Sequence, residues 1–104
     1  MCGIAGIMNL SGEDDHTSTL QKMMNGIYNR GPDSSGSYIK KNIFLGMRRL
    51  SIMDEESGDQ PFSFNNNTIQ VIFNGEIYNY HKLRKELELN DYIFQTSCDT
   101  EVIG

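Results

Sequence analysis

The chain has 104 residues, which suits one domain at most, and its net charge is −5 from fourteen acidic and nine basic residues. The basic residues are scattered, so we expect no nucleic-acid partner, and no apolar run approaches the ~18 residues that a membrane helix needs, so we expect no membrane partner. The first ten residues lack the features of a signal peptide, which predicts a cytoplasmic protein whose two cysteines are reduced thiols.

The first third of the chain predicts a strand, a loop and a helix. The apolar run 3–9 is typical of a buried strand, and the polar stretch 11–19 is typical of a loop. Four apolar residues then recur at the spacing of one helix face: Leu20, Met23, Met24 and Ile27. We expect Gly31-Pro32 to end this helix, because the residue before proline avoids helical backbone angles.

The middle of the chain predicts two strands and a long loop. Residues 37–40 and 43–52 read as strands on either side of a Lys41-Asn42 turn. Residues 54–67 are rich in Gly, Ser, Asn and Asp, and we expect them to form loop or turn. Met47 and the other methionines of this region are expected to fill the core.

The last third predicts one strand and one complete helix. Residues 68–74 are β-rich, and Asn79 is placed to cap a helix over 80–89. Residues 98–104 resemble the opening of another helix, with Asp99 as its cap, and the absence of a far end suggests truncation. The elements together predict an α+β fold with a mostly antiparallel sheet.

Cys2 directly follows the initiator methionine, which makes it the first candidate for chemistry. Removal of Met1 would leave Cys2 with a free α-amine, and such an amine titrates near enough to neutral pH to accept a proton. Nucleophile and base would then lie on one residue, as in enzymes with an N-terminal threonine. The alternative is that Cys2 is only a small residue at the start of a strand.

Five segments together carry a family resemblance: Met1-Cys2-Gly3-Ile4-Ala5-Gly6, Arg30-Gly31-Pro32-Asp33, Arg48-Arg49-Leu50-Ser51-Ile52, Asn74-Gly75-Glu76-Ile77-Tyr78-Asn79 and Ser97-Cys98-Asp99-Thr100-Glu101-Val102. In this order and spacing they resemble the class II glutamine amidotransferases, which are N-terminal nucleophile hydrolases. Their amino-acid sequences are most similar to those of the asparagine synthetase branch. The resemblance covers essentially the whole chain.

The resemblance implies a role for three catalytic residues. Cys2 would be the nucleophile that attacks the side-chain carbonyl of L-glutamine. The Asn74 side-chain amide and the Gly75 backbone N–H would form the oxyanion hole. An Asn-Gly pair after a strand is also an ordinary turn signal, and the two readings are compatible.

The resemblance also implies a substrate pocket. Arg49 would hold the α-carboxylate of glutamine, a task suited to a planar bidentate donor, and the backbone near Ile52 would line the pocket. Asp99 would bind the α-ammonium group, although it could instead only cap a helix. The Gly75 backbone and the carboxylate of Glu76 would meet the substrate's amide or ammonium group. Structurally, Arg30 is expected to belong to a helix stop and turn.

By the same resemblance, residues 1–104 would be about the first half of an αββα sandwich, a partial amidotransferase domain truncated at its C-terminal end. A synthetase domain would follow that uses ATP and Mg²⁺ to activate aspartate. We expect no cofactor or metal in this chain, because no metal-ligand spacing accompanies either cysteine. Oligomeric state, including a homodimer, stays open.

Two departures from the family pattern affect the pocket. Met47 stands where the family usually has histidine, and Cys98 separates Ser97 from Asp99, where the serine is usually adjacent. Two alternatives also remain. The chain could belong to another class II amidotransferase, of aminosugar or purine synthesis, or it could be a catalytically inactive remnant.

Overall fold

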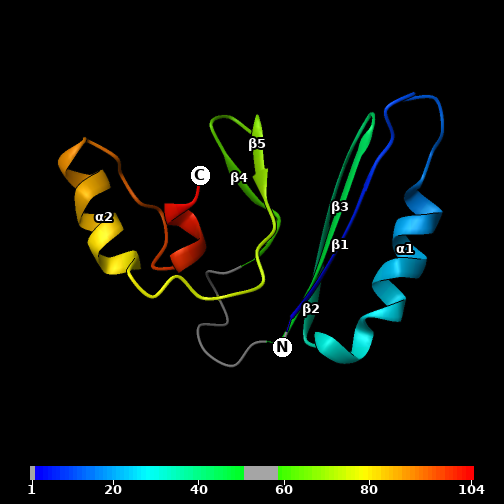
Figure 1. Cartoon of the computed structure of the whole chain (residues 1–104), viewed down its shortest axis with the longest axis horizontal. Helices are drawn as coiled ribbons and strands as arrows, with labels where there is room; N and C mark the ends of the chain where they lie inside the picture. The colour runs from blue at the N-terminus through cyan, green and yellow to red at the C-terminus, as the bar shows by residue number, and fades with distance from the viewer. Residues whose placement is uncertain (1, 51–58) are drawn as a thin grey trace.

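The structure is a computed structural model that describes residues 2–50 and 59–104. Its elements, in chain order, are β1 (Gly3–Met8), α1 (Thr17–Gly26), the 3₁₀ turn η1 (Tyr28–Arg30), β2 (Ser34–Lys40), β3 (Ile43–Arg49), β4 (Phe62–Phe64), β5 (Ile69–Val71), α2 (Tyr80–Leu89) and the 3₁₀ turn η2 (Asp99–Val102). They lie in layers along the 44 Å axis, in the order α1, the sheet of β1, β3 and β2, the sheet of β4 and β5, then α2 with η2 (Figure 1). The mixed α and β fold with antiparallel sheets is as predicted.

The first sheet has the strand order β1–β3–β2, and both of its pairings are antiparallel. β2 and β3 form a hairpin that pairs Lys40 with Ile43, with Lys41 at φ 50° in the turn. The predicted Lys41-Asn42 turn is therefore confirmed, although β2 begins three residues earlier than predicted. β3 ends at Arg49, and the predicted continuation to Ile52 falls partly outside the described residues.

The core lies between α1 and the first sheet. Ala5, Leu20, Met24 and Phe44 form one buried cluster, and Ile7 and Ile27 pack against it. Alternation along each strand sends Ala5 and Phe44 toward α1 and their neighbours toward the second sheet. Of the four residues in the predicted helical stripe, Met23 instead faces solvent and is 38% exposed.

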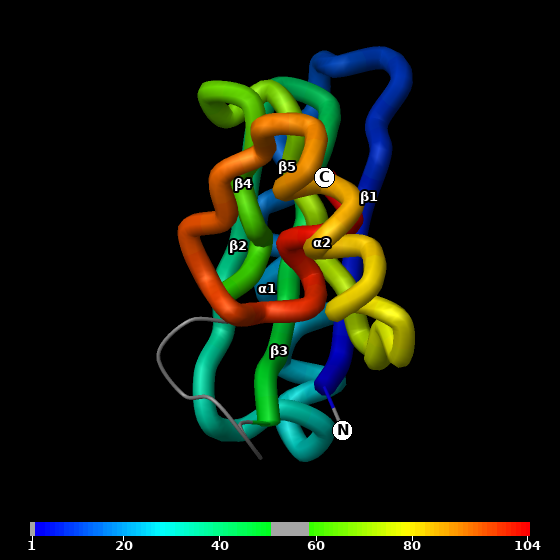
Figure 2. Tube along the Cα trace, turned by 90° about the vertical axis from the view of Figure 1, so that its left-hand side faces the viewer, coloured from blue at the N-terminus to red at the C-terminus, as the bar shows by residue number. Residues whose placement is uncertain are grey.

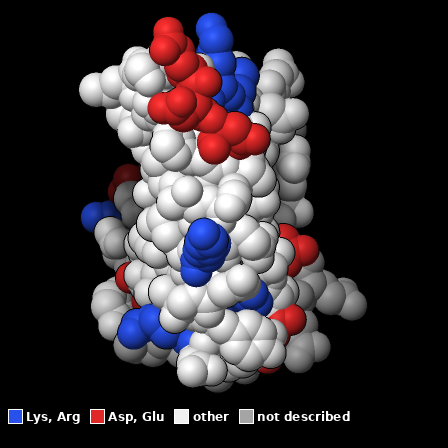
Figure 3. Space-filling view, turned by 90° about the vertical axis from the view of Figure 1, so that its right-hand side faces the viewer, with Lys and Arg blue, Asp and Glu red and all other residues white. Residues whose placement is uncertain are grey.

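The start and end of α1 differ from the predictions. The helix begins at Thr17, inside the predicted loop, because the Asp15 carboxylate accepts hydrogen bonds from both the N–H and the hydroxyl of Thr17. These bonds lower the pKa of Asp15 below its ordinary value. On the face covered by α1, acidic side chains gather at the end where the helix starts, which suits the helix dipole (Figure 3). α1 ends at Gly26, and η1 separates it from Gly31.

Gly31 lies where the chain turns from η1 toward β2 and passes against β3. A Cβ at Gly31 would lie 2.3 Å from the carbonyl carbon of Arg48, a backbone atom that cannot yield without moving the strand. We expect Gly31→Ala to lower the free energy of unfolding by about 1–3 kcal/mol, measured by chemical denaturation of the protein that carries this chain.

Gly26→Ala is the matched control for this prediction, because a Cβ at Gly26 would meet nothing within 4 Å and alanine favours the helix. Its free energy of unfolding should stay unchanged or rise slightly. Equal losses in both variants would contradict a steric role for Gly31.

The second sheet corrects the loop prediction for residues 54–67. β4 and β5 pair in an antiparallel hairpin, and Phe62 stacks on Phe64 at 4.8 Å between ring centroids. Asn65, Asn66 and Asn67 all have positive φ and make its turn, in a conformation that asparagine tolerates. β4 has only three residues, and the turn-forming residues around it hide its pattern.

The predicted bounds of α2 are confirmed, but the predicted side-chain cap is wrong. Asn79 makes no side-chain capping bond, and its backbone carbonyl instead accepts from Lys82 and Leu83. None of the α2 residues is buried. In Figure 2, α2 and η2 lie in front of β4 and β5, with the first sheet and α1 behind them.

The C-terminal segment forms a 3₁₀ turn, so the predicted helical opening is correct in kind. The cap position belongs to Cys98, not Asp99, and no side chain caps it. Among the described residues, no helix has the length and apolar character needed to cross a membrane.

Candidate active site

Cys2 lies immediately before β1 and against the end of β3. Its side chain is half-buried, and the backbone N–H of Leu50 donates to Sγ at 3.5 Å. The thiol in turn is 3.9 Å from the Leu50 carbonyl oxygen. Two strands that pair in the first sheet therefore fix the position of the sulfur. The Leu50 N–H that faces the sulfur could also donate a hydrogen bond to a thiolate.

The turn at 74–75 reaches Cys2 from 72 residues away. Nδ2 of Asn74 donates to the Cys2 carbonyl oxygen at 3.0 Å, and Nε of Arg30 donates to the same oxygen at 3.3 Å. The Asn74 side chain is exposed, so a small molecule can approach it from solvent. Cys2 and Asn74 thus lie side by side, and the role of Asn74 in an oxyanion hole stays a prediction.

Gly75 is exposed and follows directly. A Cβ at this position would lie 2.8 Å from Cζ of Phe73. A side chain at Gly75 would therefore press on the Phe73 ring. Glu76, the next residue, is also exposed.

Asp99 is brought to the same turn by a single strong contact. Its Oδ2 accepts the backbone N–H of Ile77 at 2.9 Å, and its other oxygen lies 3.8 Å from Sγ of Cys98. The predicted capping role for Asp99 is therefore wrong, since its carboxylate binds the Ile77 N–H instead. This bond joins the predicted ammonium site to the predicted oxyanion turn.

Arg49 and Arg48 show how strand alternation separates two neighbouring cations. Arg48 turns toward α1, where its Nε donates to the Met24 carbonyl oxygen and its guanidinium lies 4.8 Å from the Tyr28 ring centroid. Arg49 points to the other face, where one of its interactions is a 3.8 Å ion pair with Asp59. The Asp59 side chain is 89% exposed, so this pair is weak and a substrate carboxylate could replace it.

Two further residues named from the sequence are Ile52 and Met47. Ile52 lies outside the described residues. Met47, the departure from the family pattern, is buried on β3. Among the residues that the structure describes, no three His, Cys, Asp or Glu side chains are arranged to hold a metal ion.

Glu101 is a buried carboxylate that the sequence did not single out. It is 2% exposed, and it accepts hydrogen bonds from the backbone N–H groups of Gln95 and Thr96, each at 2.8 Å, and from the Thr96 hydroxyl. Three donors that converge on one carboxylate compensate its burial. Glu101 therefore fixes the segment that leads into Asp99.

We expect Glu101→Ala to lower the free energy of unfolding by about 2–4 kcal/mol, because three donors lose a charged acceptor. Denaturant titration of the protein that carries this chain measures the loss. Glu86→Ala is the matched control, since the Glu86 carboxylate is exposed and forms a 3.9 Å ion pair with Lys82, and the bond from Asn90 to the Glu86 backbone carbonyl would remain. Its loss should stay below about 0.5 kcal/mol. Similar losses in the two variants would contradict a structural role for the buried carboxylate.

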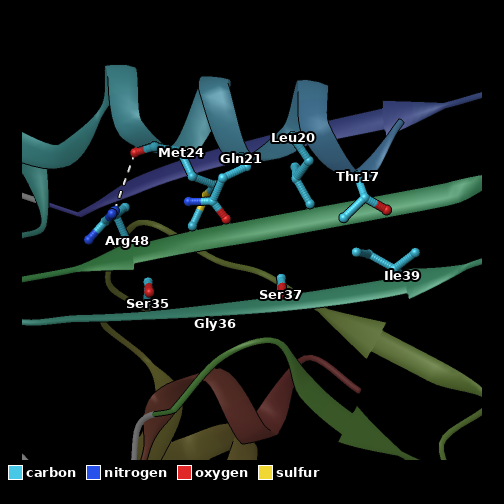
Figure 4. A pocket seen from close by; sticks show the side chains of 9 residues that line it. All are labelled: Thr17, Leu20, Gln21, Met24, Ser35, Gly36, Ser37, Ile39 and Arg48. Atoms are coloured by element: carbon cyan, nitrogen blue, oxygen red, sulfur yellow. Dashed lines mark hydrogen bonds between the residues drawn. The ribbon is translucent and has the colours of Figure 1, made fainter. Parts of the chain in front are cut away.

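A cavity of about 120 Å³ lies on the other side of the first sheet, between α1 and β2 (Figure 4). Leu20, Gln21 and Met24 line it from α1, and Ser35 and Ser37 from β2. None of the predicted site residues that the structure describes lines it. We therefore place the candidate active site at Cys2 and the turn at 74–75, on the face away from α1.

Two contacts at this site were not indicated by the sequence. The motif around Arg30 suggested only a turn, whereas its guanidinium reaches the Cys2 carbonyl. The Gln60 side chain accepts the Phe73 N–H at 2.6 Å, and no sequence pattern marks it. Both contacts join segments far apart in the chain, which local patterns cannot reveal.

Comparison with known proteins agrees with these features. A model of the glutamine amidotransferase domain matches residues 1–104. Over 99% of its length the chain is 46% identical to asparagine synthetase [glutamine-hydrolyzing] 1 and 42% identical to asparagine synthetase [glutamine-hydrolyzing] 2 of Bacillus subtilis (strain 168). Over its whole length it is 39% identical to asparagine synthetase [glutamine-hydrolyzing] 1 of Arabidopsis thaliana. The chain spans 17%, 14% and 18% of these relatives. Since the family model matches every residue, this chain belongs to the glutamine amidotransferase domain family.

Proposed function

We propose that this chain forms part of the glutaminase unit of an asparagine synthetase. Cys2 hydrolyses L-glutamine to glutamate and ammonia. A synthetase domain outside these 104 residues would then use ATP and Mg²⁺ to transfer the ammonia to aspartate. The observation that carries the proposal is the 3.0 Å hydrogen bond from the Asn74 amide to the backbone carbonyl oxygen of Cys2, which brings a candidate oxyanion donor next to the residue that carries the thiol.

The first step would use the two groups of Cys2 itself. Once Met1 is removed, the α-amine accepts the thiol proton, and the sulfur forms a bond to the side-chain carbonyl carbon of glutamine. The C–N bond then breaks, and the amine returns the proton to the leaving nitrogen so that ammonia departs. Water adds to the resulting γ-glutamyl thioester, and the C–S bond breaks to release glutamate and the free thiol.

The oxyanion of both tetrahedral intermediates would lie between the Asn74 amide and the Gly75 N–H. The Asn74 amide donates to the backbone carbonyl oxygen of Cys2 at 3.0 Å, which supports a position for the oxyanion beside this turn. Donors fixed before the reaction stabilise the charge as it develops. The Arg30 bond to the Cys2 carbonyl supports this arrangement by holding the same residue.

Substrate selection would depend on the two charged ends of glutamine. Arg49 would bind the α-carboxylate in exchange for its exposed partner Asp59, and Asp99 would bind the α-ammonium group. One Asp99 oxygen accepts the Ile77 N–H, and the other, which lies 3.8 Å from the Cys98 sulfur, would bind the ammonium group. Such a clamp selects an amino acid over a simple amide. Glu76 would face the same substrate from the exposed side of the turn.

The layered arrangement supports a finer proposal about the fold. We infer that helix, sheet, sheet and helix are layers of the αββα sandwich typical of N-terminal nucleophile hydrolases. Two packed antiparallel sheets with a helical layer outside each are the features that support it (Figure 1).

Mass spectrometry of the protein that carries this chain tests the proposed chemistry. Met1 should be absent, and acid quenching during turnover of glutamine should leave a γ-glutamyl group on Cys2. Cys98 is the built-in control, as the other free thiol. Retained Met1 would favour an inactive remnant, and an acyl group on Cys98 would contradict the assignment of Cys2.

A further inference from the structure

We propose that Gln60 is a positioning residue that holds the oxyanion turn against the segment carrying Asp99. The inference rests on the proposed function, because it assigns Gln60 to the same site. Gln60 lies before β4 and would not touch the substrate. Its side chain instead connects two segments that the substrate does touch.

The two ends of the Gln60 amide contact different segments. Oε1 accepts the Phe73 N–H at 2.6 Å, and Phe73 directly precedes Asn74. Nε2 lies 3.5 Å from Oγ1 of Thr100, which directly follows Asp99. The first bond is short and strong and the second is long and weak, so the bond to Phe73 contributes more to holding the two segments together.

The position of Phe73 directly affects the positions of the proposed oxyanion donors. The Phe73 ring lies so close to Gly75 that a Cβ there would be 2.8 Å from Cζ. A shift of Phe73 would therefore move both Asn74 and Gly75. Farther along the turn, Asp99 holds the Ile77 N–H, so Gln60 and Asp99 secure the turn at its two ends.

Gln60 is itself held in place. Gly36 of β2 passes so close that a Cβ on it would lie 1.9 Å from the Gln60 carbonyl oxygen. Thr100, at the other end, is 2% exposed. Because Gln60 is held on both sides, its side chain can fix the position of the Phe73 segment. A mobile surface glutamine could not do so. We infer that Gln60 sets the distance between the Asn74 amide and the Cys2 sulfur.

Gln60→Met tests this proposal in the protein that carries this chain, because methionine keeps the side-chain length and removes both hydrogen bonds. We expect kcat for glutamine hydrolysis to fall about 10- to 100-fold while KM changes little, because a small displacement of catalytic groups has effects of this size. Gln60→Asn, which keeps the polarity but is too short to reach Phe73, should lose a similar factor. Gln60→Glu keeps an acceptor for the Phe73 N–H and should restore kcat to within about threefold.

Gln70→Met is the matched control, because Gln70 bonds only within the second hairpin, to Ser63 and Asn67. Its kcat should equal that of the unchanged protein. Two alkylating probes then separate positioning from folding. A diazoketone analogue of glutamine should modify Cys2 more slowly in Gln60→Met, whereas iodoacetamide, which needs no oxyanion hole, should react at an unchanged rate.

The outcomes distinguish this inference from the proposed function. If Gln60→Met and Gln60→Asn keep kcat and the diazoketone rate, the positioning role is wrong while Cys2 chemistry stands. If both probes change equally, Gln60 is only a structural residue, and the proposal fails. If the unchanged protein reacts with the diazoketone at Cys98 or not at all, the proposed function itself fails.

Discussion

Cys2→Ala is expected to abolish glutamine hydrolysis, with a loss in kcat on the order of 10⁴-fold or more, because the variant has no atom that can form the thioester. The proposed synthetase of which this chain would be part should continue synthesis from added ammonia, because ammonia would bypass the proposed glutaminase site. Release of glutamate from glutamine and formation of asparagine from ammonia measure the two activities separately. Loss of the first activity with retention of the second would assign Cys2 to ammonia release alone.

The second free thiol supplies the control for this variant. Cys98 is half-buried beside Asp99, and Cys98→Ser should retain most glutaminase activity. Its readout also tests the departure from the family pattern, in which serine directly precedes the aspartate. A Cys2→Ala protein that still released glutamate from glutamine would end the assignment of the nucleophile.

Asn74→Ala is expected to lower kcat for glutamine about 10²–10³-fold, with a much smaller change in KM. The amide is proposed to bind the oxyanion, and that charge exists only in the transition state and intermediates. An interaction of this kind lowers kcat and kcat/KM together. Steady-state kinetics with glutamine measures both constants.

Asn25→Ala is the matched control, because Asn25 is exposed on α1 and its side-chain oxygen accepts a hydrogen bond from Gln21, far from the candidate site. Its kinetic constants should match those of the unchanged protein. If Asn74→Ala instead raised KM and left kcat intact, Asn74 would bind the ground state of glutamine. The oxyanion role would then be wrong.

Local patterns were sufficient for much of the fold. The spacing of apolar residues predicted β1, the core helix and the bounds of α2, and the Lys41-Asn42 turn predicted the hairpin of β2 and β3. These features depend on neighbours within a few residues. β4 was missed because it has three residues between turn-forming segments, and pairing with β5 stabilises it. Pairing of this kind is a tertiary effect that overrides local preference.

The features of the candidate site also divide into those that the sequence could predict and those that it could not. The motifs predicted roles for Cys2, Asn74 and Asp99 through resemblance, and the structure has Asn74 bonded to Cys2 and Asp99 bonded to Ile77 of the same turn. The partners of these residues were not predictable, because each contact joins distant positions. Arg30 reaches the Cys2 carbonyl across 28 residues, and Asp99 binds Ile77 instead of capping its own turn.

The structure of the Cys2→Ala variant with glutamine bound tests the central claim most directly. The account predicts that the side-chain carbonyl oxygen of glutamine lies about 3 Å from both Nδ2 of Asn74 and the Gly75 nitrogen, with its carbonyl carbon facing residue 2. Its α-carboxylate should lie at Arg49 and its α-ammonium group at Asp99. Glutamine bound in the cavity beside α1, or with its amide turned away from the 74–75 turn, would contradict the account.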